Sequence, residues 1–153
     1  MDTISFDIGL VNMAYAISSG TTITAFGLMN LKKSTFLKSL NYLSLRLSLL
    51  EWTNIKLCLI ERQQPRNTKA TRLMQHIWTW VRCLYHHVEV KIIAPSHKLK
   101  TLGFTGKTYK ARKQWAIDNA KYVLQGSLEQ AFGNLKKKDD VSDAVLQLIA
   151  YLL

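Results

Sequence analysis

Proline, cysteine and acidic residues are all scarce in this sequence of 153 residues. Only two prolines, with 48% apolar side chains, argue against a disordered chain and favour one ordinary domain. Cys58 and Cys83 lack C-x-x-C spacing, so we expect two buried, reduced thiols rather than a disulfide or a zinc site. Neither a signal peptide nor a long apolar run is visible, so we expect an intracellular protein that does not bind or span a membrane.

The shortage of acids is uneven along the chain. Ten Asp and Glu stand against 21 Lys and Arg, giving a formal net charge of +11. The stretches 62–88 and 90–117 contain no acid at all. A generic basic surface would explain part of this pattern, but a polyanionic partner explains more, and nucleic acid is favoured over a membrane. Within these stretches we expect DNA contacts from five side chains: Arg62, Arg66, Lys107, Lys110 and Arg112.

Apolar patterning predicts an α/β fold with a five-stranded mixed sheet flanked by helices. The first three strands should form an antiparallel meander with a hairpin at Ser19-Gly20. The run at 56–61 is wholly apolar before its last residue, as expected of a central strand buried on both faces. Strands are expected at 3–7, 12–18, 21–29, 56–61 and 88–94, and helices at 34–52 (capped by Ser34), 68–86, 109–125 and 141–153, with a glycine-containing loop after Pro95.

Four of the few acids fall at the ends of these elements. Asp7 and Glu61 close two apolar strands, and Asp140 and Asp143 lie one turn apart at the start of the last helix. Sites in such sheets gather at strand ends. Acids in a first helical turn also stabilise the helix dipole, which is the simpler explanation for the helical pair alone. Four carboxylates close together could not all stay ionised without cations, so we predict a two-ion Mg²⁺ site.

Neighbouring residues leave several alternatives open. Gly9 fits either a plain turn or a close approach of backbone or substrate. Asp139 is expected to cap the last helix and to point away from the other acids. Phe104 and Tyr109, in a lysine-rich segment, are candidates to touch a base or sugar. A second apolar stripe on the helix at 68–86 fits either a fully buried helix or a subunit interface; it comprises Met74, Trp78, Val81 and Tyr85.

Other chemistries have weaker support. The four histidines show no metal-ligand spacing, and the sequence has no P-loop, nucleophile elbow or Cys–His arrangement, so we expect no nucleotide cofactor. The segment Asp7–Gly9 could begin the phosphate loop of an actin-like ATPase. Such proteins need a second lobe that 153 residues do not supply.

Four motifs together resemble, in order and spacing, the poxvirus Holliday junction resolvases, relatives of bacterial RuvC and of the yeast mitochondrial resolvase. They are Ser5–Gly9, Leu59–Gln63, Tyr109–Lys113 and Lys138–Ala144. The resemblance covers nearly the whole chain. It implies a single RuvC-like, ribonuclease H-like nuclease domain over residues 1–153.

The resemblance also implies an activity. The protein would be a Mg²⁺-dependent homodimeric endonuclease, with Mn²⁺ able to replace Mg²⁺, that resolves four-way DNA junctions by paired symmetric nicks. It would leave 5′-phosphate and 3′-hydroxyl ends and act on recombining or concatemeric viral DNA in the host cytoplasm. The family's four catalytic acids correspond to Asp7, Glu61, Asp140 and Asp143. Its catalytic lysine corresponds best to Lys113, with Lys110 and Lys107 as rivals.

Two other classes of function fit the same features. A ribonuclease H-type enzyme acting on RNA–DNA hybrids would use the same acids. A non-catalytic junction-binding protein would keep the basic face but would not need the carboxylates. Comparing cleavage of hybrid, duplex and four-way substrates separates these possibilities.

Overall fold

The computed structural model describes residues 1–153 and contains five strands and six helices. The strands are β1 (Asp2–Asp7), β2 (Asn12–Ser19), β3 (Thr22–Asn30), β4 (Ile55–Glu61) and β5 (Glu89–Ile93). The helices are α1 (Phe36–Ser48), α2 (Thr68–Leu84), α3 (Ser96–Leu102), α4 (Tyr109–Val123), α5 (Ser127–Gly133) and α6 (Asp139–Leu152). None of these helices is both long and apolar enough to cross a membrane.

The sheet is mixed, with the order β3-β2-β1-β4-β5. β1, β2 and β3 pair antiparallel, and Gly20 makes the hairpin turn with a φ of 59°. β4 and β5 add parallel to β1, which places β1 and β4 inside the sheet. The expected meander, hairpin and central strand are therefore confirmed.

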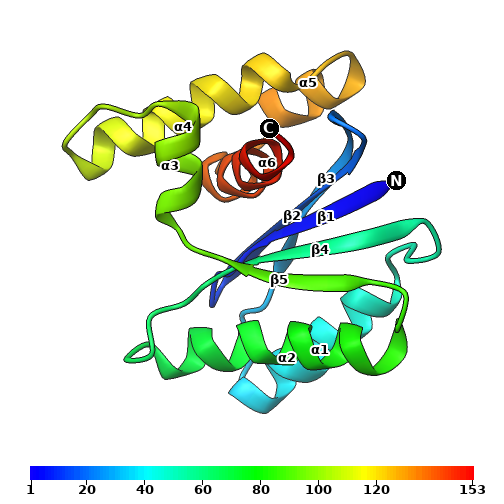
Figure 1. Ribbon diagram of the computed structural model, residues 1–153. Helices are drawn as coiled ribbons and strands as arrows, with labels where there is room; N and C mark the ends of the chain where they lie inside the picture. The colour runs from blue at the N-terminus through cyan, green and yellow to red at the C-terminus, as the bar shows by residue number, and fades with distance from the viewer.

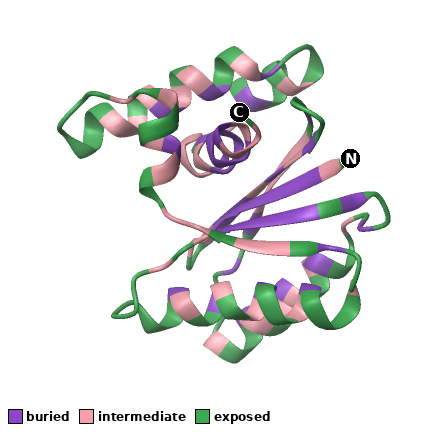
Figure 2. Cartoon of the chain, viewed as in Figure 1, coloured by how far each residue is buried: buried purple, intermediate pink, exposed green.

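Helices cover both faces of this sheet (Figure 1). α1 and α2 lie on one face, and α3, α4, α5 and α6 gather on the other. The first face closes over an apolar core that includes Ile4, Phe6 and Trp52. On the second face α6 packs onto β1 and β2, and α4 packs onto α6, around residues such as Phe132 and Val145. Figure 2 shows the buried residues concentrated along the strands and the inner sides of the helices.

Several element ends differ from the sequence-based expectations. Thr35, not Ser34, caps α1, because its side chain accepts a hydrogen bond from the Lys38 backbone N–H. α1 ends at Ser48, which frees Trp52 to enter the core beneath Tyr85, with the two rings stacked 5.3 Å apart. The segment after Pro95, expected to be a loop, begins with the short helix α3. The short helix α5 was also not expected.

The two cysteines have different environments. Cys58 is fully buried in β4, as expected, and burial raises the pKa of its thiol. Cys83 is exposed, so the expectation of a second buried thiol was wrong. It lies two residues beyond Val81, a buried residue of α2, and so points to nearly the opposite side of the helix.

Candidate active site

The pairing of β1 with β4 brings Asp7 and Glu61 to the same edge of the sheet. The strands are parallel, and Phe6 lies opposite Ile60, so the next residue of each strand is an acid at that edge. Phe6 and Ile60 point into the core under α1 and α2. Because side chains alternate along a strand, both acids point to the other face, toward α6.

Gly9 shapes the turn that follows Asp7. A Cβ atom at this position would lie 1.9 Å from the carbonyl oxygen of Asn12, a distance no side chain tolerates. The close approach is therefore one of backbone to backbone, and it lets the chain reverse into β2 directly after the acid.

Helix α6 brings the second pair of acids to this edge. Gln147 is buried and donates hydrogen bonds from Nε2 to the Ser5 hydroxyl (2.9 Å) and to the Phe6 carbonyl (3.1 Å). These bonds fix α6 against β1 one turn beyond Asp143. The four predicted acids then line one pocket of about 220 Å³, together with Lys98, Arg112 and Lys113. We call it the carboxylate pocket.

Lys98 also lines this pocket, and the sequence analysis did not predict it there. It comes from α3, is only 7% exposed, and places its Nζ 2.9 Å from Glu61 Oε2 and 3.1 Å from Asp143 Oδ1. Burial alone would lower the pKa of its ammonium, but the carboxylates of Asp143, Glu61 and Asp7 outweigh burial and raise it. Lys98 is therefore a permanent positive charge between two of the acids.

Lys113 provides a second positive charge from α4. Its Nζ lies 3.0 Å from Asp143 Oδ2 and 3.5 Å from Asp139 Oδ2. Partial burial opposes the charge, but these carboxylates raise the pKa of the ammonium well above its usual value. The expectation that Asp139 caps α6 and points away was wrong: Lys138 holds the cap position, and Asp139 shares Lys113 with Asp143.

Of the four acids, Asp7 has the fewest direct contacts with cationic side chains. It is 8% exposed and takes part in none of the ion pairs of this chain. Burial, followed by repulsion from Glu61 and Asp143, raises the pKa of its carboxyl well above the ordinary value, although Lys98 opposes this. Burial and the neighbouring Asp139 likewise raise the pKa of Asp140, against the attraction of Lys137. The pocket thus holds more negative charge than its lysines neutralise.

This donor set suits a hard divalent cation, although the carboxylates are not closed around one. No group of three or more His, Cys, Asp or Glu side chains is arranged to hold a metal ion here. Instead Lys98 lies between Glu61 and Asp143, and Asp140 pairs with Lys137 at 3.2 Å. The carboxylate oxygens that line the pocket nevertheless suit Mg²⁺, which prefers such ligands, and a cation would stabilise the ionised form of the buried Asp7 carboxyl.

The residues expected to contact DNA surround this pocket unequally. Arg112 is half-buried in its wall, and Lys107 lies beside Arg112 in an adjoining hollow. Lys110 is exposed on α4. Arg62 and Arg66 are exposed in the loop between β4 and α2.

The two aromatic candidates near the pocket also differ. Phe104 is half-buried: it packs on Trp115, with ring centroids 5.1 Å apart, and it also lines the hollow that contains Lys107. Tyr109 is 68% exposed, and the cationic groups of Arg112 and Lys113 lie 5.2 and 5.4 Å from its ring centroid. Tyr109 thus remains available to a sugar or base beside the acids.

The expected second stripe on α2 is only partly exposed. Val81 is fully buried and Tyr85 stacks on Trp52, so both belong to the core. Trp78 is 44% exposed, and with Met74 and Ile92 of the edge strand β5 it lines a shallow apolar hollow. The candidate contact surface therefore lies across α2 and β5 rather than along α2 alone.

The family model for the poxvirus A22 protein matches residues 1–153. A curated relative, the uncharacterized protein 97L of Invertebrate iridescent virus 3, is 31% identical over 101 residues. That match covers 65% of this chain and 49% of the relative, so the chain spans about half the relative's length.

Solved structures with the same fold include three junction resolvases. The fowlpox virus Holliday junction resolvase matches with a TM-score of 0.70 and 19% identity, over 99% of this chain and 97% of that one. Thermus thermophilus RuvC matches with a TM-score of 0.70 and 13% identity over 98% and 92%. The yeast mitochondrial Holliday junction resolvase matches with a TM-score of 0.69 and 19% identity over 98% and 77%. These likenesses confirm the expected RuvC-like, ribonuclease H-like fold.

Proposed function

The chain belongs to the poxvirus A22 protein family, and from this premise we propose that it is a Mg²⁺-dependent endonuclease that resolves four-way DNA junctions. The observation that carries the proposal is the carboxylate pocket. Three separate elements bring four acids together there, in a chain that is otherwise short of acid. The fowlpox virus resolvase and Thermus thermophilus RuvC, which share the fold, have both been solved with Holliday junction DNA.

The metal would be held by the four acids of the pocket. When bound, two divalent ions supply Lewis-acid stabilisation to the phosphate and lower the pKa of water near it. Asp7 lies deepest, so its carboxylate gains most from added positive charge. Hydrolysis would join a water oxygen to phosphorus and break the bond to the 3′-oxygen, leaving 5′-phosphate and 3′-hydroxyl ends.

Lys113 is the lysine best placed to meet the cleaved phosphate. It is held by Asp143 and Asp139 yet remains partly exposed, so its remaining N–H groups can donate to phosphate oxygens as charge develops there. Lys107 and Lys110 are exposed and form no ion pair with these acids. Lys98 is buried deeper and would position Glu61 and Asp143.

Paired symmetric nicks require two active sites, so we propose a homodimer. The hollow formed by Met74, Trp78 and Ile92 is the surface that supports it, because a half-exposed Trp beside an edge strand suits a buried contact. A two-fold axis would place the same patch on both subunits and fix the distance between the two carboxylate pockets. Junction preference would follow from that distance, since phosphate contacts themselves carry no sequence information.

A substrate comparison tests this function. The purified protein is incubated with Mg²⁺ and three labelled substrates: a four-way junction, a linear duplex of the same sequence and an RNA–DNA hybrid. We expect nicking of the junction well before the duplex or hybrid. Preferential cutting of the hybrid would support a ribonuclease H-type enzyme. Junction binding with no cleavage in Mg²⁺ or Mn²⁺ would support a non-catalytic binding protein.

A further inference from the structure

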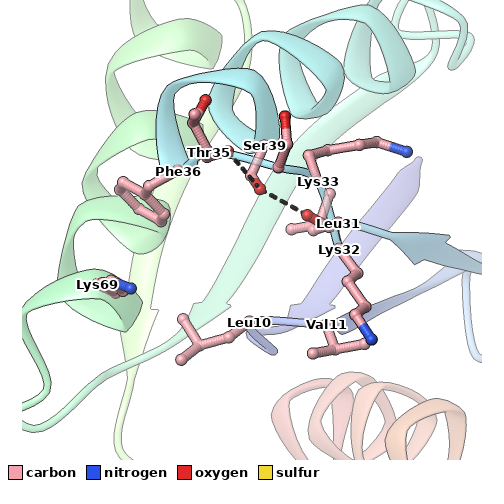
Figure 3. Close-up of a pocket in the computed structure, with 10 residues that line it drawn as sticks. Leu10, Val11, Leu31, Lys32, Lys33, Thr35, Phe36, Ser39 and Lys69 are labelled. Carbon is pink, nitrogen blue, oxygen red and sulfur yellow. Dashed lines mark hydrogen bonds between the residues drawn. The ribbon is translucent and has the colours of Figure 1, made fainter.

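A second hollow, formed by loops from the same edge of the sheet, has the opposite charge character (Figure 3). It measures about 250 Å³ and lies between the β1–β2 turn, the β3–α1 connection and the first turn of α2. We call it the lysine pocket. Its lining contains three lysines and no acid; the residues are Leu10, Val11, Leu31, Lys32, Lys33, Ser34, Thr35, Phe36, Ser39 and Lys69.

The lysines of this pocket are not neutralised by the protein. All three are exposed, and none belongs to any of the six ion pairs of the chain. Lys33 turns toward Tyr42, with Nζ 3.9 Å from the ring centroid. Lys32 and Lys69 approach from two sides, with Leu10 between them, as Figure 3 shows. Their positive charge is therefore free to meet an anion.

The rest of the lining is apolar and partly open. Leu10 is 43% exposed and Val11 46%, and Phe36 closes the pocket from the start of α1. A ligand that fits must combine an anionic group with a less polar body. The volume falls below the roughly 300–1,000 Å³ of typical small-molecule sites. A phosphate with its attached sugar satisfies both conditions better than a whole nucleotide cofactor.

Chain connectivity places this pocket close to the acids. Leu10 follows Asp7 by three residues, so their Cα atoms can be at most about 11 Å apart. Along one DNA strand the helix rises about 3.4 Å per nucleotide. This upper limit therefore corresponds to about three nucleotides. Lys69 is tied to the same edge, because β4 ends at Glu61 and α2 begins at Thr68.

From this arrangement we infer that the lysine pocket is a subsite for the DNA sugar–phosphate backbone, within about three nucleotides of the cleaved phosphate. The inference rests on the proposed function and adds Lys32 and Lys69 to its DNA-binding surface. The apolar wall would pack on the sugar, and the ammonium groups of Lys32 and Lys69 would each bind one of the two phosphates that flank it. Such a contact fixes the register of the strand over the carboxylate pocket without reading sequence.

The test measures junction binding in EDTA across a salt series for Lys32→Ala, Lys69→Ala and the double variant. The slope of log affinity against log salt is negative, and each lost phosphate contact should reduce its magnitude by about 0.9. The double variant should reduce the magnitude by about 1.8. Lys56→Ala is the matched control, because Lys56 is equally exposed but lies near the start of β4, at the other end of the strand from Glu61. It should keep the wild-type slope. Circular dichroism confirms that each variant is folded.

A second measurement locates the contact. Single phosphates on either side of the nick are replaced by neutral methylphosphonates, and affinity is measured for wild type and double variant. We expect one or two positions within about three nucleotides of the nick to weaken wild-type binding but not to weaken the double variant further. Unchanged salt slopes, or sensitive positions only in distant parts of the arms, would overturn the inference.

The same data distinguish this inference from the proposed function. If the variants show a weaker salt dependence of junction affinity but wild type does not cut junctions in Mg²⁺, the DNA subsite stands and the nuclease proposal fails. If wild type cuts junctions but the variants keep the wild-type slope, the nuclease stands and the lysine pocket is not a subsite.

Discussion

The carboxylate pocket and the lysine pocket use the same type of side chain for opposite purposes. In the first, Lys98 and Lys113 are held in ion pairs at 2.9–3.5 Å and balance part of a negative cluster. In the second, Lys32 and Lys69 are exposed and unpaired beside apolar residues. The charge of a lysine held by carboxylates is partly balanced within the site, whereas the charge of an unpaired lysine stays wholly available to an anion. The net charge of +11 does not distinguish the two.

The largest expected effect comes from neutralising the acids themselves. Glu61→Gln and Asp140→Asn should each lower the rate of junction cleavage by at least about 10³-fold, since metal ions contribute several kcal/mol and each 1.36 kcal/mol is tenfold. Binding should survive, because these acids would hold ions rather than DNA. Cleavage rates and gel-shift affinities check both statements. Variants that cut junctions at the wild-type rate would show that the carboxylate pocket is not the active site.

Removing Lys98 should cost stability where removing Lys32 does not. Lys98→Met leaves Glu61 and Asp143 without their buried partner, and such losses typically cost about 3–5 kcal/mol. Lys32→Met, at an exposed position without an ion pair, should change the free energy of unfolding by less than about 0.5 kcal/mol. Urea denaturation in EDTA measures both. Equal changes in the free energy of unfolding would show that the ion-paired Lys98 contributes no more to stability than the exposed Lys32.

Disrupting the proposed dimer should leave both pockets intact. Trp78→Arg places a charge in the apolar hollow and should weaken dimerisation by about 2 kcal/mol or more, as for a typical interface hot spot. Sedimentation should then show monomers with wild-type circular dichroism, and junctions should be cut on one strand rather than in pairs. A variant that stays dimeric, or that unfolds, would exclude this surface. Leu84→Arg, at an apolar position of α2 that is 58% exposed and lies outside the hollow, is the control.

The smallest expected effects belong to single exposed cations around the pockets. Arg66→Ala changes the loop before α2, and Lys110→Ala changes α4. Each should reduce the magnitude of the slope of log junction affinity against log salt by about 0.9. Neither should change the unfolding free energy measurably. If both slopes match wild type, the DNA path avoids the two stretches that lack acids.

Much of this site could be predicted because its acids end strong local patterns. The apolar runs of β1 and β4 identify strands directly, and parallel pairing of their ends brings Asp7 and Glu61 together. Two acids three residues apart at a helix start share a face whatever that helix packs against. The sequence could not specify the Gln147 contacts that fix α6 on β1, since they join residues about 140 positions apart.

Lys98 could not be recognised for a different physical reason. α3 has only seven residues, too few to show a periodic apolar stripe, and Gly103 beside Gly106 favours a loop. A lysine in such a segment is expected to be solvated. Its burial depends on tertiary structure, since α3 packs on α6 and brings Lys98 to Glu61 at the end of β4. The sequence also left open whether Val81 and Tyr85 belong to the core or to an interface, because a helix pattern does not say how wide its buried face is.

The central claim is that the four acids make a cation-dependent site for cutting branched DNA. The most direct test labels each of the four strands of a synthetic junction in turn and maps nicks made by wild type in Mg²⁺ and in EDTA. We expect nicks at symmetric positions on two opposing strands, with ends that ligase can reseal, and none in EDTA. Cleavage that persists in EDTA, or that falls on no symmetric pair, would contradict it.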